Sequence, residues 1–225
     1  MSLNKSERKK KRNFWILLFL LIGPASILVF VSKQGCEHKF ETLSDYGKVP
    51  DFRFIDINGN SITKKDFKDN VVLFSVLQES CPDSCSISFW HLNQMIYQHI
   101  RKNPKKLAHV KLISIITDGK GNGVDKFQTI FQTINDQVEQ YNPKQWMLVR
   151  GDAKALYNIT HNKQSLLQKG EKYYGGEAFQ ELLLLMDKNG HLRMVLNGKT
   201  EGMIRKMKDY IALLDKQYDK EKLKK

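Results

Sequence analysis

Two cysteines placed four positions apart are the side chains of this sequence best suited to chemistry. Cys81 and Cys85 lie in the run ESCPDSC, which follows a nearly continuous apolar segment at 70–77. A buried strand that passes directly into a helix would place both side chains on one face of the first helical turn. Their Cα atoms would then be about 6 Å apart, a separation that a disulfide accepts. The pair is therefore expected to close a reversible disulfide, to hold a soft metal ion, or to do both.

The surroundings of the pair favour a reactive thiolate at Cys81. Pro82 suits the first residue of a helix, where its missing N–H has no intrahelical bond to lose. The free N–H groups at the helix start and the helix dipole stabilise negative charge beside them. A thiolate is both the nucleophile of disulfide exchange and a soft ligand for Cu(I). The alternative is a purely structural disulfide that closes a short loop, although such a bond gains little from an activated sulfur.

Strand and helix patterns alternate along the chain on both sides of the cysteines. The sequence predicts a hairpin over 51–63 and strands at 70–77, 110–116, 146–149, 182–186 and 192–196. Helices are expected from Cys85 to about Arg101, over 124–140, over 152–159 with Asp152 as N-cap, and from a cap at Thr200 onward. This order predicts an α/β fold, a thioredoxin-like mixed sheet with helices on both faces and an N-terminal hairpin.

The start of the chain has the pattern of a membrane anchor. Residues 5–12 hold six Lys or Arg and one Glu, and no charge follows over 14–32. An apolar helix of that length nearly spans a bilayer, and the basic cluster before it should stay in the cytoplasm. The rival is a cleaved signal peptide with its core at 14–22, but apolar residues continue through Val31. The chain is thus divided into a basic cytoplasmic segment 1–13, a transmembrane helix 14–32, a spacer 33–48, a folded domain 49–217 and a charged tail 218–225.

The net charge of +13 does not by itself indicate a nucleic-acid partner. Residues 5–12 account for +5 of it, and the rest is spread along the chain without a zinc-knuckle spacing or an RNP-type aromatic run. We therefore expect no nucleic-acid binding. Three cysteines are too few for a disulfide-dense scaffold, and Cys36 is expected to be a lone thiol near the membrane.

The segment Cys81-Pro82-Asp83-Ser84-Cys85 after a buried strand resembles the C-x-x-x-C copper motif, usually CPDxC, of the Sco/SenC family. Members are membrane-anchored, thioredoxin-like proteins that help to load copper into cytochrome c oxidase. The similarity continues over about 49–215, in the stretches VPDF (49–52), SIITD (114–118), 146–152 and LLMDKNG (184–190). It implies that Cys81 and Cys85 are both Cu(I) ligands and a redox pair. It also implies a copper subunit of a terminal oxidase as recipient and a periplasmic thiol reductase as partner.

One position departs from the pattern of the family. Its third copper ligand is a His eight residues before the Asp of the last turn, and that position is Phe179 here. Of the six histidines, His161 is the best-placed substitute, although a surface loop histidine is its simpler interpretation. His91 falls within a helix, and the strand over 182–187 should carry His191 to the far end of the sheet. Without an imidazole, two thiolates can hold Cu(I), but Cu(II) should bind poorly.

These observations leave three classes of function. The first is a metallochaperone anchored in the bacterial inner membrane by one helix, with its N-terminus inside and its domain in the periplasm. We favour a bacterial membrane over a mitochondrial one because no Arg- and Ser-rich transit segment precedes the apolar stretch. The second is an enzyme, a metal-independent thiol–disulfide oxidoreductase, which Phe179 favours. The third is a degenerate domain that serves only as an assembly scaffold.

Overall fold

The computed structural model describes residues 13–20, 22–24, 26–27, 42–78, 89–118, 120–161, 164–165, 171–173, 176–178 and 182–223. The chain divides into two units, Met1–Glu41 and Thr42–Lys225. In the first unit the described residues are helical. In the part of the chain that the structure describes, no helix combines the length and the apolar character that a membrane crossing needs. The predicted anchor at 14–32 is only partly described and stays a prediction.

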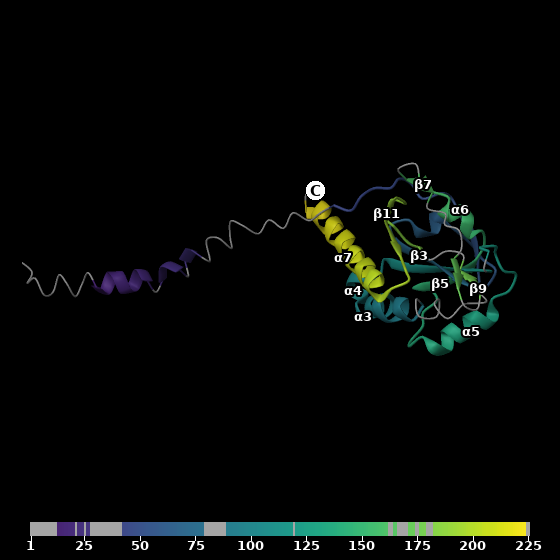
Figure 1. Cartoon of the computed structure of the whole chain (residues 1–225), viewed down its shortest axis with the longest axis horizontal. Coiled ribbons are helices and arrows are strands. Elements are labelled where there is room, and N and C mark those ends of the chain that lie inside the picture. The colour runs from purple at the N-terminus through teal and green to yellow at the C-terminus, as the bar shows by residue number, and fades with distance from the viewer. Residues whose placement is uncertain are drawn as a thin grey trace, which may run out of the picture. The chain divides into compact units, whose positions relative to one another are not determined.

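The second unit is built on a mixed sheet of seven strands in the order β11-β10-β3-β4-β5-β1-β2 (Figure 1). Their bounds are β1 Arg53–Asp56, β2 Ser61–Thr63, β3 Val71–Gln78, β4 Val110–Thr117, β5 Trp146–Arg150, β10 Leu182–Met186 and β11 Leu192–Asn197. β3, β4 and β5 are parallel to one another. The hairpins β1–β2 and β10–β11 are added antiparallel at the two edges. The predicted mixed sheet with an N-terminal hairpin is thereby confirmed.

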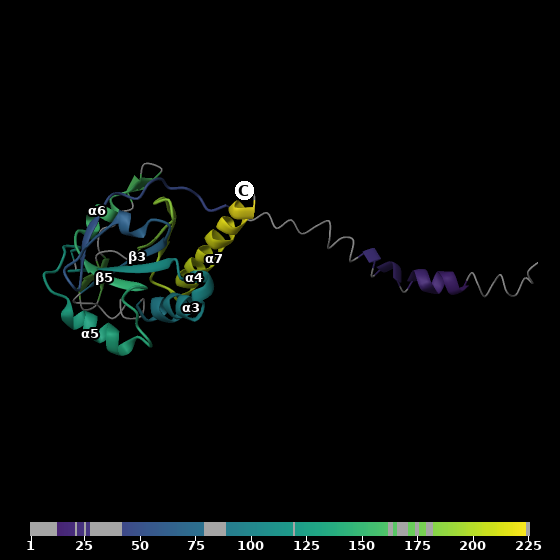
Figure 2. The same ribbon diagram turned by 180° about the vertical axis from the view of Figure 1, so that it is seen from behind.

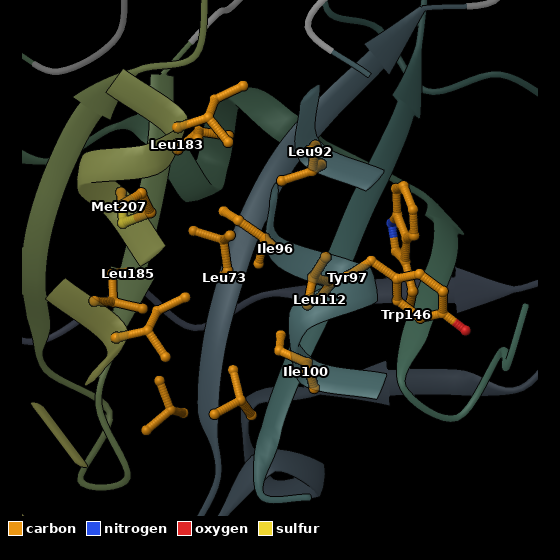
Figure 3. Packing of buried hydrophobic residues seen from close by; sticks show 14 of the residues in the cluster. Leu73, Leu92, Ile96, Tyr97, Ile100, Leu112, Trp146, Leu183, Leu185 and Met207 are labelled. Carbon is orange, nitrogen blue, oxygen red and sulfur yellow. The ribbon is translucent and has the colours of Figure 1, made fainter. Parts of the chain in front are cut away.

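Helices cover both faces of this sheet, as expected (Figure 2). They are η1 Lys64–Phe67, η2 Leu92–Tyr97, α3 Gln98–Lys102, α4 Pro104–Leu107, α5 Gln128–Gln137, α6 Ala153–Tyr157 and α7 Glu201–Leu223. Alternate residues of each inner strand serve the two faces. Leu73 of β3 lies in one core cluster with residues of η2, α3, α5 and α7, while Phe74 lies in the other with residues of η1 and α6. Figure 3 shows the first cluster, to which Leu73 of β3 and Leu112 of β4 belong together with the helix residues Ile96 and Ile100.

Some elements differ from the sequence predictions. The helix expected over 124–140 is shorter, Gln128–Gln137, and the helix after the cysteine segment contains a π-helical stretch, η2. A π turn holds one residue more than an α turn. Gln98 marks it, because its backbone N–H donates to the carbonyl of Asn93 five residues earlier and its side chain donates to the Asn93 amide oxygen at 3.1 Å. Two short hairpins were also not predicted, β6 (Thr160–His161) with β7 (Gln164–Ser165) and β8 (Glu171–Tyr173) with β9 (Gly176–Ala178).

A half-buried arginine, Arg193, connects the entering chain to the β10–β11 hairpin. Arg193 donates from Nη2 to the Leu43 carbonyl at 2.6 Å and from Nε to the Ser44 carbonyl at 3.0 Å. Its Nη1 donates to Asp187 at 3.0 Å, and that carboxylate is only 3% exposed. Asp187 also accepts from the backbone N–H of Asn189, so the buried charge is paired and hydrogen-bonded. Residues 43 and 44 are thus fixed to the turn that ends at β11.

We expect Arg193→Met to lower the free energy of unfolding by about 3–5 kcal/mol, because it leaves the buried Asp187 carboxylate without its partner. Urea denaturation followed by circular dichroism measures this loss. The matched control is Arg205→Met, which removes an exposed pair with Glu201 and should change the value by no more than about 0.5 kcal/mol. Equal losses in the two variants would contradict the role given to Arg193.

Candidate functional site

The segment that carries the cysteines follows β3 at the end of the sheet where the parallel strands finish. β3 ends at Gln78, which pairs with Thr117 at the end of β4, and β5 ends in the same direction at Arg150. The predicted site residues Cys81 and Cys85 lie within 79–88, outside the described residues. Covalent geometry alone keeps the Cα of Cys81 within about 11 Å of that of Gln78. The described neighbours of this end of the sheet therefore define the surroundings of the predicted site.

Thr117 is a buried polar residue at this end of the sheet. It is fully buried beside Gln78, and its Oγ1 has no hydrogen-bond partner among the described residues. A buried hydroxyl without a partner lowers the free energy of unfolding by about 1–3 kcal/mol. A polar group brought next to Thr117 could therefore gain a hydrogen bond from it. On the other side of Thr117, an isolated bridge connects it to Gly123.

The turn after β4 is organised around Asp118. Its Oδ1 accepts the backbone N–H groups of Lys120 and Asn122, both at 2.8 Å, and its Oδ2 accepts the Asn122 side-chain amide at 2.7 Å. Lys154 donates from Nζ to the amide oxygen of Asn122 at 2.9 Å. Desolvation alone would raise the pKa of Asp118, but these hydrogen bonds and the charge of Lys154 outweigh it, and the pKa lies below its ordinary value. The ionised Asp118 carboxylate thus fixes the conformation of the loop that follows β4, at the end of the sheet where the cysteine segment begins.

The helix that follows the cysteine segment is fixed to the core through aromatic contacts. Phe89, the first described residue after the segment, lies 5.3 Å from the Trp146 ring between centroids. Tyr97 lies 5.2 Å from the same ring, also between centroids (Figure 3). Trp146 Nε1 donates to Ser114 Oγ at 2.9 Å, and Ser114 Oγ is 2.7 Å from Ser75 Oγ. Trp146 therefore couples the helix to the two strands that lead to the site.

Five of the six histidines lie among the described residues, and His99 is the one that lies in α3. His191 pairs with Asp45 at 2.8 Å and forms a bridge with Lys48, at the end of the sheet where β3 begins, as expected. His109 lies 3.3 Å from Asp215. His91 is half-buried near the start of the helix, and its Nδ1 has no hydrogen-bond partner among the described residues. His161 lies in β6, the strand that pairs with β7.

No group of three or more His, Cys, Asp and Glu side chains suited to a metal ion occurs among the described residues. Phe179, like the two cysteines, lies outside them. The copper ligands Cys81 and Cys85 therefore stay predictions, and the described structure contributes the end of the sheet at which they would act. Sequence reasoning included Asp118 in the stretch SIITD but missed its role in holding the loop, and it missed the Thr117 hydroxyl that has no partner among the described residues.

Comparison with known proteins gives a consistent family and fold. The family model described as SCO1/SenC matches residues 41–212. No curated protein matches the chain. Among solved structures, BsSco, a member of the Sco family of cytochrome c oxidase assembly proteins in which a disulfide switch was identified, is 13% identical with a TM-score of 0.56. The match covers 78% of this chain and 97% of that one.

Two further solved structures are Sco proteins with copper bound. ScoI of Bradyrhizobium japonicum is 20% identical with a TM-score of 0.50, and the match covers 72% of this chain and 98% of that one. ScoI of Arabidopsis thaliana is 16% identical with a TM-score of 0.53, over 76% of this chain and 99% of that one. At these identities the likeness shows the fold, which is the mixed α/β fold of the Sco proteins.

The Asp118 loop should loosen at acid pH. Because the pKa of Asp118 is lowered in the folded protein, the carboxylate contributes stability above its unfolded-state pKa of about 3.8, and this is lost as the pH falls through the folded value. We expect the amide NMR signals of Lys120 and Asn122 to shift together at a midpoint below that pH.

Asp118→Ala should remove this titration and speed amide hydrogen exchange at Asn122 by roughly tenfold at neutral pH, because two charge-assisted hydrogen bonds are lost. Asp125→Ala, which removes an exposed carboxylate from the same connection, is the matched control. Unchanged exchange in Asp118→Ala would show that the backbone alone holds the loop.

Proposed function

Because the chain belongs to the SCO1/SenC family, we propose that it is a membrane-anchored copper-delivery and thiol-redox protein. In this proposal Cys81 and Cys85 bind Cu(I), and the protein assists copper-site assembly in a respiratory terminal oxidase. The observation that carries it is the place of the CPDSC run, three residues after Gln78 at the end of the sheet where the parallel strands finish. The copper bound to two Sco proteins of the same fold supports copper as the cargo.

Two thiolates suit Cu(I) as a substrate that is received and passed on. Thiolates are soft ligands, and two of them can hold Cu(I) in a near-linear geometry. Cu(I) binding requires that both cysteines are reduced and deprotonated. Any proton still held by either thiol is therefore released when Cu(I) binds. Oxidation of the pair to a disulfide gives up two electrons and two protons, and copper can bind again only after a reductase returns them. The proposal therefore includes a periplasmic thiol reductase and, as recipient, the copper subunit of the oxidase.

The anchor proposed for this protein is a single helix over 14–32. The uncharged stretch follows a basic cluster, which favours a cytoplasmic N-terminus and a periplasmic location for residues 42–225. In that compartment a free dithiol tends to become oxidised, which is the reason why a reductase is needed.

A second function is favoured by Phe179. Where the family's third ligand would be, this chain has a side chain without a metal-binding atom. A metal-independent thiol–disulfide oxidoreductase would need only Cys81 and Cys85. The disulfide switch identified in BsSco supports thiol chemistry on this fold.

A Cu(I) titration of the reduced full chain in detergent, against a competing Cu(I) chelator, separates the two functions. We expect one tightly bound Cu(I) per chain, and a loss of affinity of at least about 100-fold in Cys81→Ser and in Cys85→Ser, because one thiolate cannot complete the site. Cys36→Ser is the matched control and should bind as the wild type does. No competition with the chelator, together with rapid exchange with a disulfide substrate, would support the oxidoreductase instead.

Phe179→His should create tight Cu(II) binding that the wild-type protein lacks. An imidazole adds the nitrogen donor that Cu(II) prefers over a purely sulfur site. Electron paramagnetic resonance should then report nitrogen coupling in Phe179→His and none in the control Phe179→Leu. If the wild type already gives a nitrogen-coupled Cu(II) signal that His161→Ala removes, His161 is the third ligand and the expectation for Phe179 is wrong.

A further inference from the structure

A groove lined by lysines lies at the end of the sheet opposite the cysteine segment. Its volume is about 480 Å³, and we call it the lysine groove; its lining is Asp51, Lys64, Lys65, Phe67, Lys68, Met186, Lys188, Asn189 and Gly190. Met186 pairs with Val72, near the start of β3, whereas the cysteine segment follows Gln78 at its end. Seven residue steps separate Val71 from Gln78, so the two ends of β3 are about 23 Å apart.

The rim of the groove is cationic. Lys65 and Lys68 are exposed, and their side chains form no ion pair or hydrogen bond within the described residues. Lys64 donates to the Val49 carbonyl at 2.5 Å, and Lys188 lies 3.7 Å from Glu221. Asp51 is the single carboxylate in the lining, so the lining carries a net charge of +3.

The floor of the groove is apolar. Phe67 is 4% exposed and Met186 is 1% exposed, and both belong to the core cluster on that face of the sheet. Cations around an apolar floor suit a ligand that has a phosphate and, next to it, an apolar part. Lysine side chains are adapted to such a boundary, because their stems lie on apolar surface while the ammonium group reaches the anion.

The chain enters the folded unit beside this groove. The carbonyls of Leu43 and Ser44 are bonded to Arg193, and Lys48 forms a bridge with His191, which follows Asn189 and Gly190 of the groove lining. From residue 43 onward the chain is therefore held on the domain at this end of the sheet. Only 33–42 separate that point from the proposed membrane helix, and ten residues extend at most about 36 Å.

We infer that the lysine groove docks on anionic phospholipid headgroups of the membrane that holds the anchor. The inference rests on the proposed function in one respect, the helix over 14–32. The short tether keeps the groove within reach of the bilayer, so a weak attraction suffices to hold the docked state. Each lysine near an anionic lipid surface strengthens such association by roughly fivefold. Docking through this end directs the opposite end of β3, and the cysteine segment that follows it, away from the bilayer.

Amide hydrogen exchange of the full chain in nanodiscs tests the docking. The discs contain phosphatidylcholine alone or phosphatidylcholine mixed with phosphatidylglycerol. We expect exchange in η1 and in the β10–β11 turn to be at least threefold slower in the anionic discs, and high salt to remove the difference because it screens the attraction. Equal exchange in the two kinds of disc would overturn the inference.

The variant Lys65→Glu/Lys68→Glu should abolish the protection, since both side chains are exposed and unpaired within the described residues. Lys126→Glu/Lys206→Glu is the matched control, because it makes the same change of net charge at exposed lysines outside the groove and should keep the protection. Loss of protection in both variants would show a response to total charge and would contradict a specific surface.

Two further outcomes would also contradict lipid docking. A chain that leaves the discs in high salt has no membrane helix, which refutes the anchor and the docking together but leaves the copper titration as an independent test of the proposed function. Protection by added polyglutamate, without any difference between the discs, would overturn lipid docking in favour of an acidic protein partner.

Discussion

β3 and β4 pair in parallel along eight positions, from Val71 beside Val110 to Gln78 beside Thr117. Because parallel strands run in the same direction, this pairing gives the sheet one end at which β3 and β4 finish and an opposite end at which they begin. The CPDSC run follows the end at which they finish, together with the Asp118 loop. The lysine groove and residues 43–48 lie at the opposite end, where β3 begins. The two ends of the molecule therefore differ in chemistry for a reason that lies in the strand directions.

Burial of β3 on both faces is what makes this arrangement rigid. Its first five residues are buried, and the apolar ones alternate between the two core clusters. The polar exceptions are satisfied internally, since Ser75 and Ser114 share a hydrogen bond with each other and Ser114 accepts one from Trp146. The end of the sheet that precedes the cysteines is thus carried by a packed core, while the Thr117 hydroxyl at that end has no partner among the described residues. A rigid, packed core next to a hydroxyl without a hydrogen-bond partner among the described residues is an arrangement that suits a binding site.

Much of this fold could be predicted from local pattern. The run NVVLFSVL indicated a buried strand, LLLLM is β10 at the predicted bounds, and Asp152 caps α6 by accepting from the N–H groups of Lys154 and Ala155. The position of His191 followed from strand length alone. The attachment of residues 43–48 could not be predicted, because it depends on Arg193 and His191 meeting them from the far end of the sequence. The π turn of η2 was missed for a related reason, since an apolar period of about 3.6 residues does not reveal one extra residue.

The wide turn in η2 also constrains how this region can change in evolution. It lies between the cysteine segment and α3, and α3 is clamped by Arg101, which bonds Glu139 at 2.9 Å. Removing one residue from an ordinary turn of this helix would rotate everything before that turn by about 100° about the helix axis, whereas removing one from the wide turn would only restore ordinary helical spacing. Since α3 is held in place, a rotation that arises in an ordinary turn would fall on the residues before it, and Phe89 would be turned away from the Trp146 ring. Single-residue deletions are therefore expected to be accepted more readily in η2 than in the ordinary turns of this helix.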